Sequence, residues 1–409
     1  MSPSVDVVVV SLLLSVFNPA NFARQLIGTH ILFRHGERSP TMLYPSDPND
    51  LSFWSNGLGS LTVRGKFQHI HLGQYFRERY STLLNSTYVA SEIFVRSSDY
   101  DRTLMSAYLT LLGLYSASSI NISTDSIISI NTWPENLPWQ PIPVHTVPKS
   151  MDTLLGVSDC AQYTALVKQM KKSERIQNIN SQFRDLFEYL EKNTKQPVSD
   201  LFDAWAISDT VLIENFILFC QKSYNIAPLW ATPAVIHQLQ YISDIAAYHL
   251  MFMSEINRLR GGPLLRDILE NIEDLILNKS KRRKAKIYSG HETTIAATLS
   301  FLGINYPHQP PLASALFFDL YRLDNDSHGI QLEYLNMTNG RTAYPIQLPG
   351  CESTICSIAT LKQLLEHRLP KDMNKECQIY LTNGLVSSYD LCSPVILFFT
   401  IFTILFYFK

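Results

Sequence analysis

The stretch Ile31-Leu-Phe-Arg-His-Gly-Glu-Arg-Ser-Pro40 changes from apolar to charged residues in a single step. Its apolar residues predict the end of a buried strand, and Gly36 predicts a sharp turn where a side chain would clash. Ligands bind at such strand ends in open α/β sheets. Arg34 and Arg38 can grip phosphoryl oxygens with paired N–H groups, and His35 can attack phosphorus. The alternative is a solvated basic turn in which the histidine only packs.

Polar residues with complementary chemistry follow a second short strand, in Ile287-Tyr-Ser-Gly-His-Glu-Thr-Thr-Ile-Ala-Ala297. The strand is expected to end at Ser289-Gly290, and His291 and Glu292 are expected to open a helix. Helix N-termini attract anions through their free N–H groups and the helix macrodipole. His291 can therefore contact a phosphate, and Glu292 can serve as a proton donor.

A further short strand, Ile93-Phe-Val95, is followed directly by Arg96. This repeats the arrangement of the first stretch, with a cationic side chain at the C-terminal end of a strand. A helix is predicted to begin at Arg102. The alternative interpretation of Arg96 is a salt bridge to Asp99 or Asp101.

Composition places the chain among globular proteins with a sizeable core. Its 409 residues allow two to three domains, or one large domain with an insertion. The net charge of −2 gives no argument for nucleic acid as a partner. The six cysteines show no paired CxxC spacing, so structural zinc is not expected.

The character of the sequence changes between residues 149 and 260, where glycine becomes scarce and amphipathic stretches follow one another. We interpret this segment as a helical insertion, with stretches at Tyr163–Lys172, Ile179–Lys192, Val211–Tyr224 and Ala234–Leu259. Its polar and aromatic residues either rim a pocket or belong to core and caps, and both interpretations stay open for Trp205, Asp209 and Trp230.

Both ends of the chain are apolar. Residues 7–17 have the length of a signal-peptide core, which predicts a signal peptide over residues 1–23, with a buried strand as the alternative. Residues 386–409 include the uncharged run Val395–Phe408, which is followed by Lys409. At about 14 residues, this run is short of the ~20 that span a bilayer comfortably. This tail is similar to a GPI-anchor signal, with a short transmembrane anchor as the rival.

If the protein enters the secretory pathway, its cysteines and its Asn-x-Ser/Thr sites can be modified. Cysteines should pair in an oxidising compartment. Five Asn-x-Ser/Thr sites would become glycan acceptors, at Asn85, Asn121, Asn278, Asn325 and Asn336. The expected location is extracellular, at the cell surface or lysosomal, and either soluble or attached to the membrane through the tail.

The order Arg-His-Gly-x-Arg-x-Pro at Arg34–Pro40 resembles the signature of the histidine acid phosphatases, of the prostatic and lysosomal type that includes insect venom acid phosphatase-like proteins. Arg-Ser-x-Asp-x-Asp-Arg-Thr at Arg96–Thr103 and His-Glu-Thr-Thr at His291–Thr294 extend the likeness. The resemblance implies a doubly wound α/β sheet domain, similar to phosphoglycerate mutases, with a mainly helical insert. The sheet domain would comprise residues 24–148 and 261–385, on either side of the insert at 149–260.

The resemblance also implies a two-step hydrolysis of phosphate monoesters without a metal or other cofactor. His35 would become phosphorylated, and Glu292 would protonate the leaving oxygen. The phosphoryl oxygens would be held by four cationic side chains, Arg34, Arg38, Arg96 and His291. Small-molecule phosphate monoesters are the expected substrates, with phosphoproteins as a further class, and a homodimer is left open.

The sequence departs from the family pattern in two places. Glu292 stands where the best-known members carry Asp, so the geometry of proton donation is open. The resemblance implies two disulfides, Cys160–Cys377 and Cys351–Cys356, whereas a third pair is lost near Ala315. Cys220 and Cys392 are left unassigned.

Three other functions compete with an acid phosphatase. A mutase would use the same histidine chemistry, but the predicted signal peptide and paired cysteines disfavour that cytosolic role. A phytase-like or otherwise specialised histidine phosphatase is a second option, because the insert matches the family poorly. A catalytically silent secreted binding protein is a third.

Overall fold

The computed structural model describes residues 24–115, 140–156, 159–221, 228–251, 253–279, 282–324, 326–336 and 342–378, with the backbone alone over 216–221. The predicted signal peptide, the apolar C-terminal tail and Cys392 lie outside these residues, as do the glycan sites Asn121 and Asn325. Within the described part of the chain, no helix combines the length and the apolar character needed to cross a membrane.

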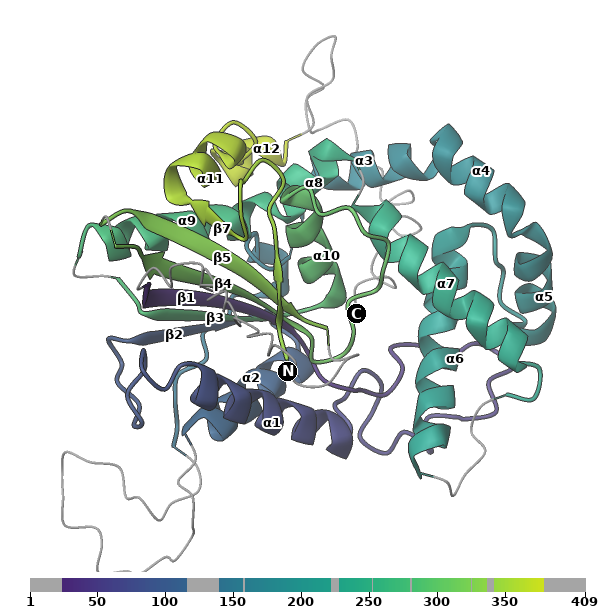
Figure 1. Cartoon of the computed structure of the whole chain (residues 1–409). Helices are drawn as coiled ribbons and strands as arrows, with labels where there is room; N and C mark the ends of the chain where they lie inside the picture. The colour runs from purple at the N-terminus through teal and green to yellow at the C-terminus, as the bar shows by residue number, and fades with distance from the viewer. Residues whose placement is uncertain are drawn as a thin grey trace, which may run out of the picture.

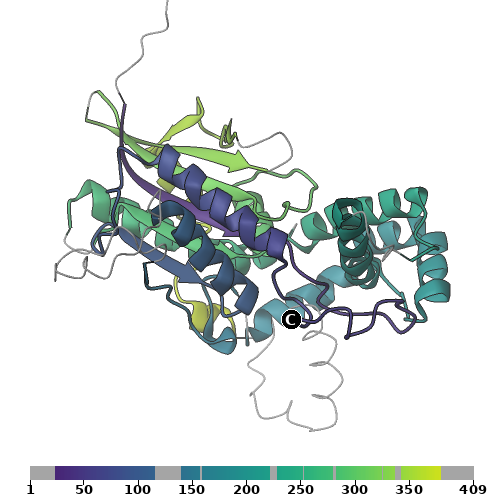
Figure 2. The ribbon, with the colours of Figure 1, turned by 90° about the horizontal axis from the view of Figure 1, so that it is seen from below.

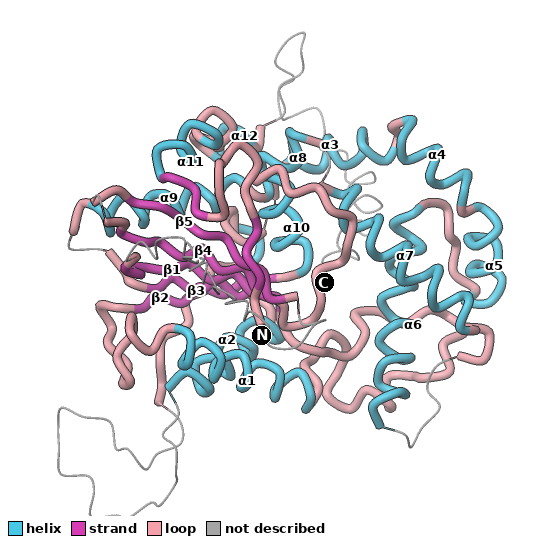
Figure 3. Tube along the Cα trace, viewed as in Figure 1, coloured by secondary structure: helices cyan, strands magenta, loops and turns pink. Residues whose placement is uncertain are grey.

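A mixed sheet forms the centre of the molecule (Figures 1 and 3). Its strands run in the spatial order β2-β3-β1-β4-β5-β6, and β7 also pairs with β5. The pairs β1–β3 and β2–β3 are parallel, whereas the pairs on the other side of β1 are antiparallel. The strands are β1 (Gln25–Arg34), β2 (Ile93–Ser97), β3 (Ala285–Gly290), β4 (Ala315–Arg322), β5 (His328–Leu335), β6 (Tyr344–Ile346) and β7 (Ile355–Ser357).

Helices cover both faces of the sheet because successive side chains of β1 point to opposite sides. Ile31 and Phe33 belong to the core beneath α1 (Val63–Arg79) and α2 (Asp101–Tyr115). Leu32 belongs to the opposite core, with α9 (Gly262–Ile276), α10 (Glu292–Phe301) and α11 (Ile358–Leu365). Figures 1 and 2 show the two helix layers. The expected doubly wound sheet domain is confirmed.

The chain between β2 and β3 includes a helical segment (Figure 2). The helices of this segment share a hydrophobic core of their own. Two predicted stretches are each divided, at Phe183 and at Met251–Met253. The helix expected at Val211 begins ten positions earlier, at Leu201. The elements are η2 (Lys149–Met151), α3 (Ala161–Lys171), α4 (Glu174–Gln182), α5 (Arg184–Thr194), α6 (Leu201–Gln221), α7 (Pro233–Leu250) and α8 (Ser254–Arg260). The exact domain boundaries stay a prediction.

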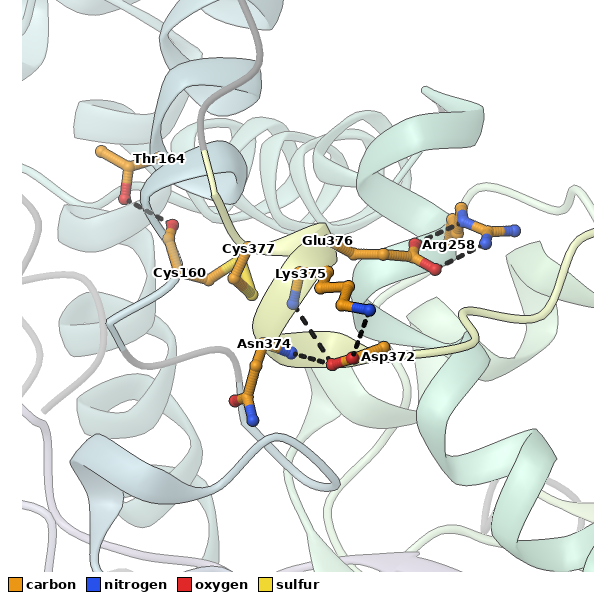
Figure 4. The surroundings of a disulfide bond; sticks show 8 residues. All are labelled: Cys160, Thr164, Arg258, Asp372, Asn374, Lys375, Glu376 and Cys377. Atoms are coloured by element: carbon orange, nitrogen blue, oxygen red, sulfur yellow. Dashed lines mark hydrogen bonds and ion pairs between the residues drawn. A yellow bond between two sulfur atoms is a disulfide. The ribbon is translucent and has the colours of Figure 1, made fainter. Parts of the chain in front are cut away.

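Both expected disulfides form, Cys160–Cys377 and Cys351–Cys356. Cys160 caps the start of α3, and Cys377 follows the short helix α12 (Met373–Glu376) (Figure 4). A forked ion pair between Arg258 and Glu376, with both N–O distances 2.6 Å, holds the same helix against α8. The last described helix is thereby tied to the helical segment from two sides.

Candidate active site

Three neighbouring parallel strands end at the same edge of the sheet, and each delivers one of the motifs found in the sequence. Arg34 is the last residue of β1, and His35 follows it. Arg96 lies near the end of β2. After β3, His291 caps α10 and Glu292 is the first residue of that helix. Arg34, His35, Arg38, His291 and Glu292 lie close together there. Arg96, near the end of β2, contacts Ser97, Thr146 and Asp152 instead.

Close backbone packing holds the turn after β1 against the start of α1. A Cβ atom on Gly36 would lie 2.5 Å from the carbonyl oxygen of Gly65, and a Cβ on Gly65 would lie 2.1 Å from the carbonyl oxygen of Glu37. Thr62 caps α1 through the backbone N–H of Gly65 and donates its hydroxyl hydrogen to the Glu37 carboxylate over 2.7 Å. Gly36 is thus required by a close approach, as a clash argument predicts.

The imidazole of His35 is buried, with 1% of its surface exposed. Its Nδ1 lies 2.8 Å from the carbonyl oxygen of Gly36. Because a carbonyl oxygen can only accept, Nδ1 must carry the hydrogen. In the neutral ring Nε2 therefore keeps its lone pair, and this nitrogen lies on the side of Glu292, 3.9 Å from Oε2.

Burial and neighbouring cations keep His35 unprotonated. Desolvation, followed by Arg102, Arg34, Arg38 and His291, lowers the pKa of His35 well below 6.5. An ordinary histidine would be largely charged, and so unable to attack, at acidic pH. The lowered pKa favours the neutral form of this imidazole, with its lone pair free.

Each expected arginine faces a carboxylate. The shortest distances in these pairs are 3.1 Å for Arg34–Glu292, 2.9 Å for Arg38–Asp209 and 2.9 Å for Arg96–Asp152. Asp209 comes from α6 of the helical segment, so its place at the pocket settles a point that the sequence left open. The partner of Arg96 is neither Asp99 nor Asp101, the two candidates that the sequence offered.

The carboxyl of Glu292 is buried but surrounded by positive charge. Burial would raise the pKa of Glu292, but Arg34, Arg38 and Arg102 together lower it below its usual value. In the absence of a bound anion this carboxyl is therefore ionised and held by Arg34.

His291 lies beside His35, with the two ring centroids 5.6 Å apart. Its Nε2 lies 2.9 Å from the hydroxyl of Ser98, and the ring of Tyr100 meets it edge to face. Burial, Arg102 and Arg260 lower the pKa of His291 well below 6.5, so it is neutral and acts as a hydrogen-bonding group.

Sequence reasoning did not single out Arg102 and Asp152. Arg102 was seen only as the start of a helix, although it belongs to the motif Arg-Ser-x-Asp-x-Asp-Arg-Thr. Asp152 follows a proline-rich linker, and no motif in the sequence marks it as a partner of Arg96. Among the described residues, no group of three or more His, Cys, Asp or Glu is placed to hold a metal ion.

A profile of the histidine phosphatase superfamily (branch 2) matches residues 25–335. This chain belongs to that family. The matched range includes all three strand ends and the helical segment between them, so the family relationship covers the whole candidate site.

Characterised relatives agree with this assignment. The chain is 35% identical to the lysosomal acid phosphatase of Xenopus laevis over 366 residues, which cover 88% of this chain and 80% of the relative. It is 35% identical to the prostatic acid phosphatase of Bos taurus, over 87% of this chain and 89% of the relative. The expectation of an acid phosphatase of the histidine phosphatase type is confirmed.

Solved structures of phytases share the fold. The phytase of Citrobacter braakii superposes with a TM-score of 0.65 at 18% identity, covering 87% of this chain and all of the other. The Hafnia alvei phytase in complex with tartrate gives a TM-score of 0.62, also at 18% identity. At this level of identity the likeness concerns the fold alone.

Proposed function

We propose that this protein hydrolyses phosphate monoesters through a phosphohistidine formed on Nε2 of His35. The observation that carries the proposal is the hydrogen bond from Nδ1 of His35 to the Gly36 carbonyl, which leaves the other ring nitrogen free to attack. This nitrogen lies among buried guanidiniums, and Glu292 stands beside it.

In the first step, Nε2 of His35 attacks phosphorus, and the bond from phosphorus to the leaving oxygen breaks. Glu292 gives its proton to that oxygen, so the product leaves as a neutral alcohol. In the second step, water attacks phosphorus and the P–N bond breaks. The ionised Glu292 takes the proton of this water, which restores the starting state and releases inorganic phosphate.

The role of Glu292 as an acid requires that its carboxyl be protonated while substrate is bound. An anionic phosphoryl group at Arg34 would compete with Glu292 for the guanidinium, 3.1 Å away, and would raise the pKa of the carboxyl. Protonation in turn releases Arg34 to hold phosphoryl oxygens. Acidic pH favours this exchange, whereas the low pKa of His35 preserves the nucleophile.

The test is hydrolysis of a chromogenic aryl phosphate near pH 5. The parent protein should turn over, and His35→Ala should lose activity by several orders of magnitude while its circular dichroism spectrum is unchanged. His71→Ala, at an exposed histidine on α1, is the matched control and should retain full activity. A parent protein without turnover would contradict the proposal and favour a silent binding protein.

We also propose that the protein enters the secretory pathway and is held at the membrane through residues 386–409. Support comes from the apolar segments at both ends, from the two disulfides, and from relatives named for the lysosome and the prostate. A phosphatidylinositol-specific phospholipase should release activity from intact cells if the tail is replaced by a GPI anchor. Activity that stays on the membrane with an intact Lys409 would indicate a transmembrane tail instead.

A further inference from the structure

Two carboxyl groups meet inside the molecule, apart from the reacting groups. Glu214 on α6 is fully buried, and Asp47 is half-buried on the loop of residues 41–61, which follows the His35 segment (Arg34–Pro40). Asn49 bridges them, because its side-chain N–H donates to Oε1 of Glu214 over 2.7 Å and its backbone N–H donates to Oδ1 of Asp47 over 2.9 Å. The two remaining carboxyl oxygens are buried and receive no hydrogen bond from any described N–H or hydroxyl group.

The carboxyl pair, Asp47 and Glu214, holds a proton. The two groups hydrogen-bond to one another, and a bond between two carboxyls needs a proton on one of them. Two ionised carboxylates in contact and shielded from water would repel one another strongly. Burial and Asp47 accordingly raise the pKa of Glu214 to about 9. The pair therefore keeps one proton at a pH where two ordinary carboxyls would keep none.

The surroundings of the carboxyl pair offer no positive charge in place of that proton. No lysine, arginine or histidine of the described residues contributes to the pKa of either carboxyl. On the same loop, burial and the two carboxyls raise the pKa of the Tyr44 hydroxyl, so it stays neutral. On α6, Asp209 is already paired with Arg38. At the end of α5, the carbonyl of Thr194 accepts from the N–H of Ser46 over 3.2 Å.

The part of α6 that carries Glu214 also contacts the candidate active site. Figures 1 and 2 show the 41–61 loop running from the sheet domain to the helical segment. Asp209 accepts two hydrogen bonds from Arg38, over 3.0 and 2.9 Å. Thr210 donates its hydroxyl hydrogen to the carbonyl of Met42 over 2.8 Å. Because residues four apart on a helix are neighbours, Thr210 and Glu214 hold adjacent parts of the loop against α6. The contact between α6 and the loop therefore extends from Arg38 to the carboxyl pair.

We propose that the shared proton of Asp47 and Glu214 holds the 41–61 loop against α6 and thereby keeps Asp209 on Arg38. Glu214 is a positioning residue in this account, since it contacts none of the reacting groups. The inference rests on the proposed function and deepens it, because it gives the enzyme a second requirement for acid besides the protonation of Glu292.

The sign of the pH dependence follows from where the proton is lost. When the loop leaves α6, water reaches both carboxyls, and the pKa of Glu214 returns towards its ordinary value of 4.5. Between pH 4.5 and about 9, the closed pair keeps a proton that the open pair releases. Each rise of one pH unit in this window favours the open form by up to about tenfold. The loop is therefore held in acid and loosens as the pH rises towards neutrality.

The test is cleavage of the 41–61 loop in the folded protein by a protease of broad specificity, between pH 5 and 8. The proteins compared are the parent, Glu214→Gln and Glu188→Gln. The glutamine amide can donate to Asp47 at any pH, and Glu188 is exposed on α5, so its variant removes a carboxyl away from the pair. The cleavage rate of the parent divided by that of Glu214→Gln should rise by up to about tenfold per pH unit. Glu188→Gln should match the parent at every pH, and the ratio cancels the pH dependence of the protease.

Inorganic phosphate separates a role at the active site from mere support of the fold. Under the proposed function, phosphate binds at Arg38 and stabilises the closed arrangement. At a concentration ten times its dissociation constant, phosphate should slow cleavage of the loop in the parent by about tenfold. A cleavage rate that ignores bound phosphate would overturn the connection between the carboxyl pair and Arg38.

A ratio of cleavage rates that does not change with pH would overturn the inference as a whole. If Glu214→Gln fails to fold, Asp47→Asn supplies the same comparison, because its amide can donate to Glu214 without a shared proton. The cleavage measurement requires no turnover. A parent protein that is inactive but shows the expected ratio would therefore contradict the proposed function and not the carboxyl pair, so the two failures are distinguishable.

Discussion

At the scale of residues, the candidate site is built from buried pairs of opposite charge. Glu292 occupies Arg34 in the free enzyme at 3.1 Å, and Asp209 occupies Arg38 with two hydrogen bonds. Under the proposed mechanism, a bound phosphoryl group would displace the first carboxylate and share Arg38 with the second. Protonation of Glu292 would then be linked to substrate binding.

We expect Glu292→Gln to slow phosphorylation of His35 more for esters with poor leaving groups than for esters with good ones. A nitrophenolate departs with little help from a proton, whereas an alkoxide needs one, and such help is typically worth ~10²–10⁴-fold. The measurement is single-turnover phosphorylation with esters of graded leaving-group pKa. Parallel lines for the variant and the parent would show instead that Glu292 only positions His291.

Side chains of the candidate site could be predicted where polar residues directly follow a strand in the sequence. Arg34 and His35, at the end of β1, are of this kind. Asp152 and Asp209 could not, because a carboxylate that neutralises an arginine from another element has no local pattern. In the sequence, Arg102 indicates only the start of a helix. That its side chain is buried could be seen only in the structure.

At the scale of elements, the position of the His35 segment depends on how closely α1 approaches it. Gly65 is the contact point, because a Cβ atom there would lie 2.1 Å from the carbonyl oxygen of Glu37. The strands and helices around the site were predictable from apolar runs. The close approach at Gly65 could not be predicted, because the sequence does not show which backbone packs against a glycine inside a helix.

Gly65→Ala should therefore lower stability by about 1–3 kcal/mol and also lower kcat/KM, because the backbone at Glu37, two positions after His35, must shift. Gly73→Ala is a matched control on the same helix, where the added Cβ would lie 2.0 Å from the Thr110 carbonyl oxygen in α2. Both variants should lose stability in thermal unfolding. An equal loss of kcat/KM in the folded forms of both would contradict a specific role for Gly65.

The helical segment shows the limit of pattern reasoning at this scale. The amphipathic run Ile179–Lys192 predicted one helix, but α4 and α5 meet at Phe183. A change of helix direction without glycine or proline leaves the spacing of the apolar residues almost unchanged, so it cannot be read from the sequence.

α6 begins at Leu201 because Asp200 accepts from the N–H groups of Phe202 and Asp203.

At the scale of the whole molecule, two disulfides close loops of very different length. Cys160–Cys377 joins residues 217 positions apart, whereas Cys351–Cys356 joins residues five apart. Loop-closure entropy predicts a contribution of about 5 kcal/mol for the long loop and about 2 kcal/mol for the short one. Replacing each pair by alanine and measuring urea unfolding should reproduce this order. A larger loss from the short loop would contradict the entropic account.

Buried histidines should make the molecule less stable in acid. Burial, helped by Lys286, lowers the pKa of His30 to about 3, and burial lowers that of His69 to about 3. The folded state then binds fewer protons than the unfolded one between these values and 6.5. Stability present above pH 6.5 is lost as the pH falls, at about 1.4 kcal/mol per histidine and pH unit.

Carboxyls whose pKa is raised by burial oppose this trend, and Glu214 is the one with a large shift. Burial and Asp47 raise the pKa of Glu214 to about 9, so its contribution is present below pH 4.5 and is lost as the pH rises. Between pH 4.5 and 6.5, the two histidines together change the stability more than Glu214 does. Thermal unfolding across this range should show a falling midpoint, with a smaller slope in His69→Leu but not in His71→Leu. Equal slopes in all three proteins would refute the assignment.

The most direct test of the central claim is the chemical identity of the phosphorylated residue. The parent protein is mixed with an aryl phosphate, quenched in alkaline denaturant within milliseconds, and digested for mass spectrometry. Because a phosphoramidate survives base, the label should be found on His35, and neither His35→Ala nor an unmixed sample should contain it. Phosphate on any other residue, or turnover that continues in His35→Ala, would contradict the account.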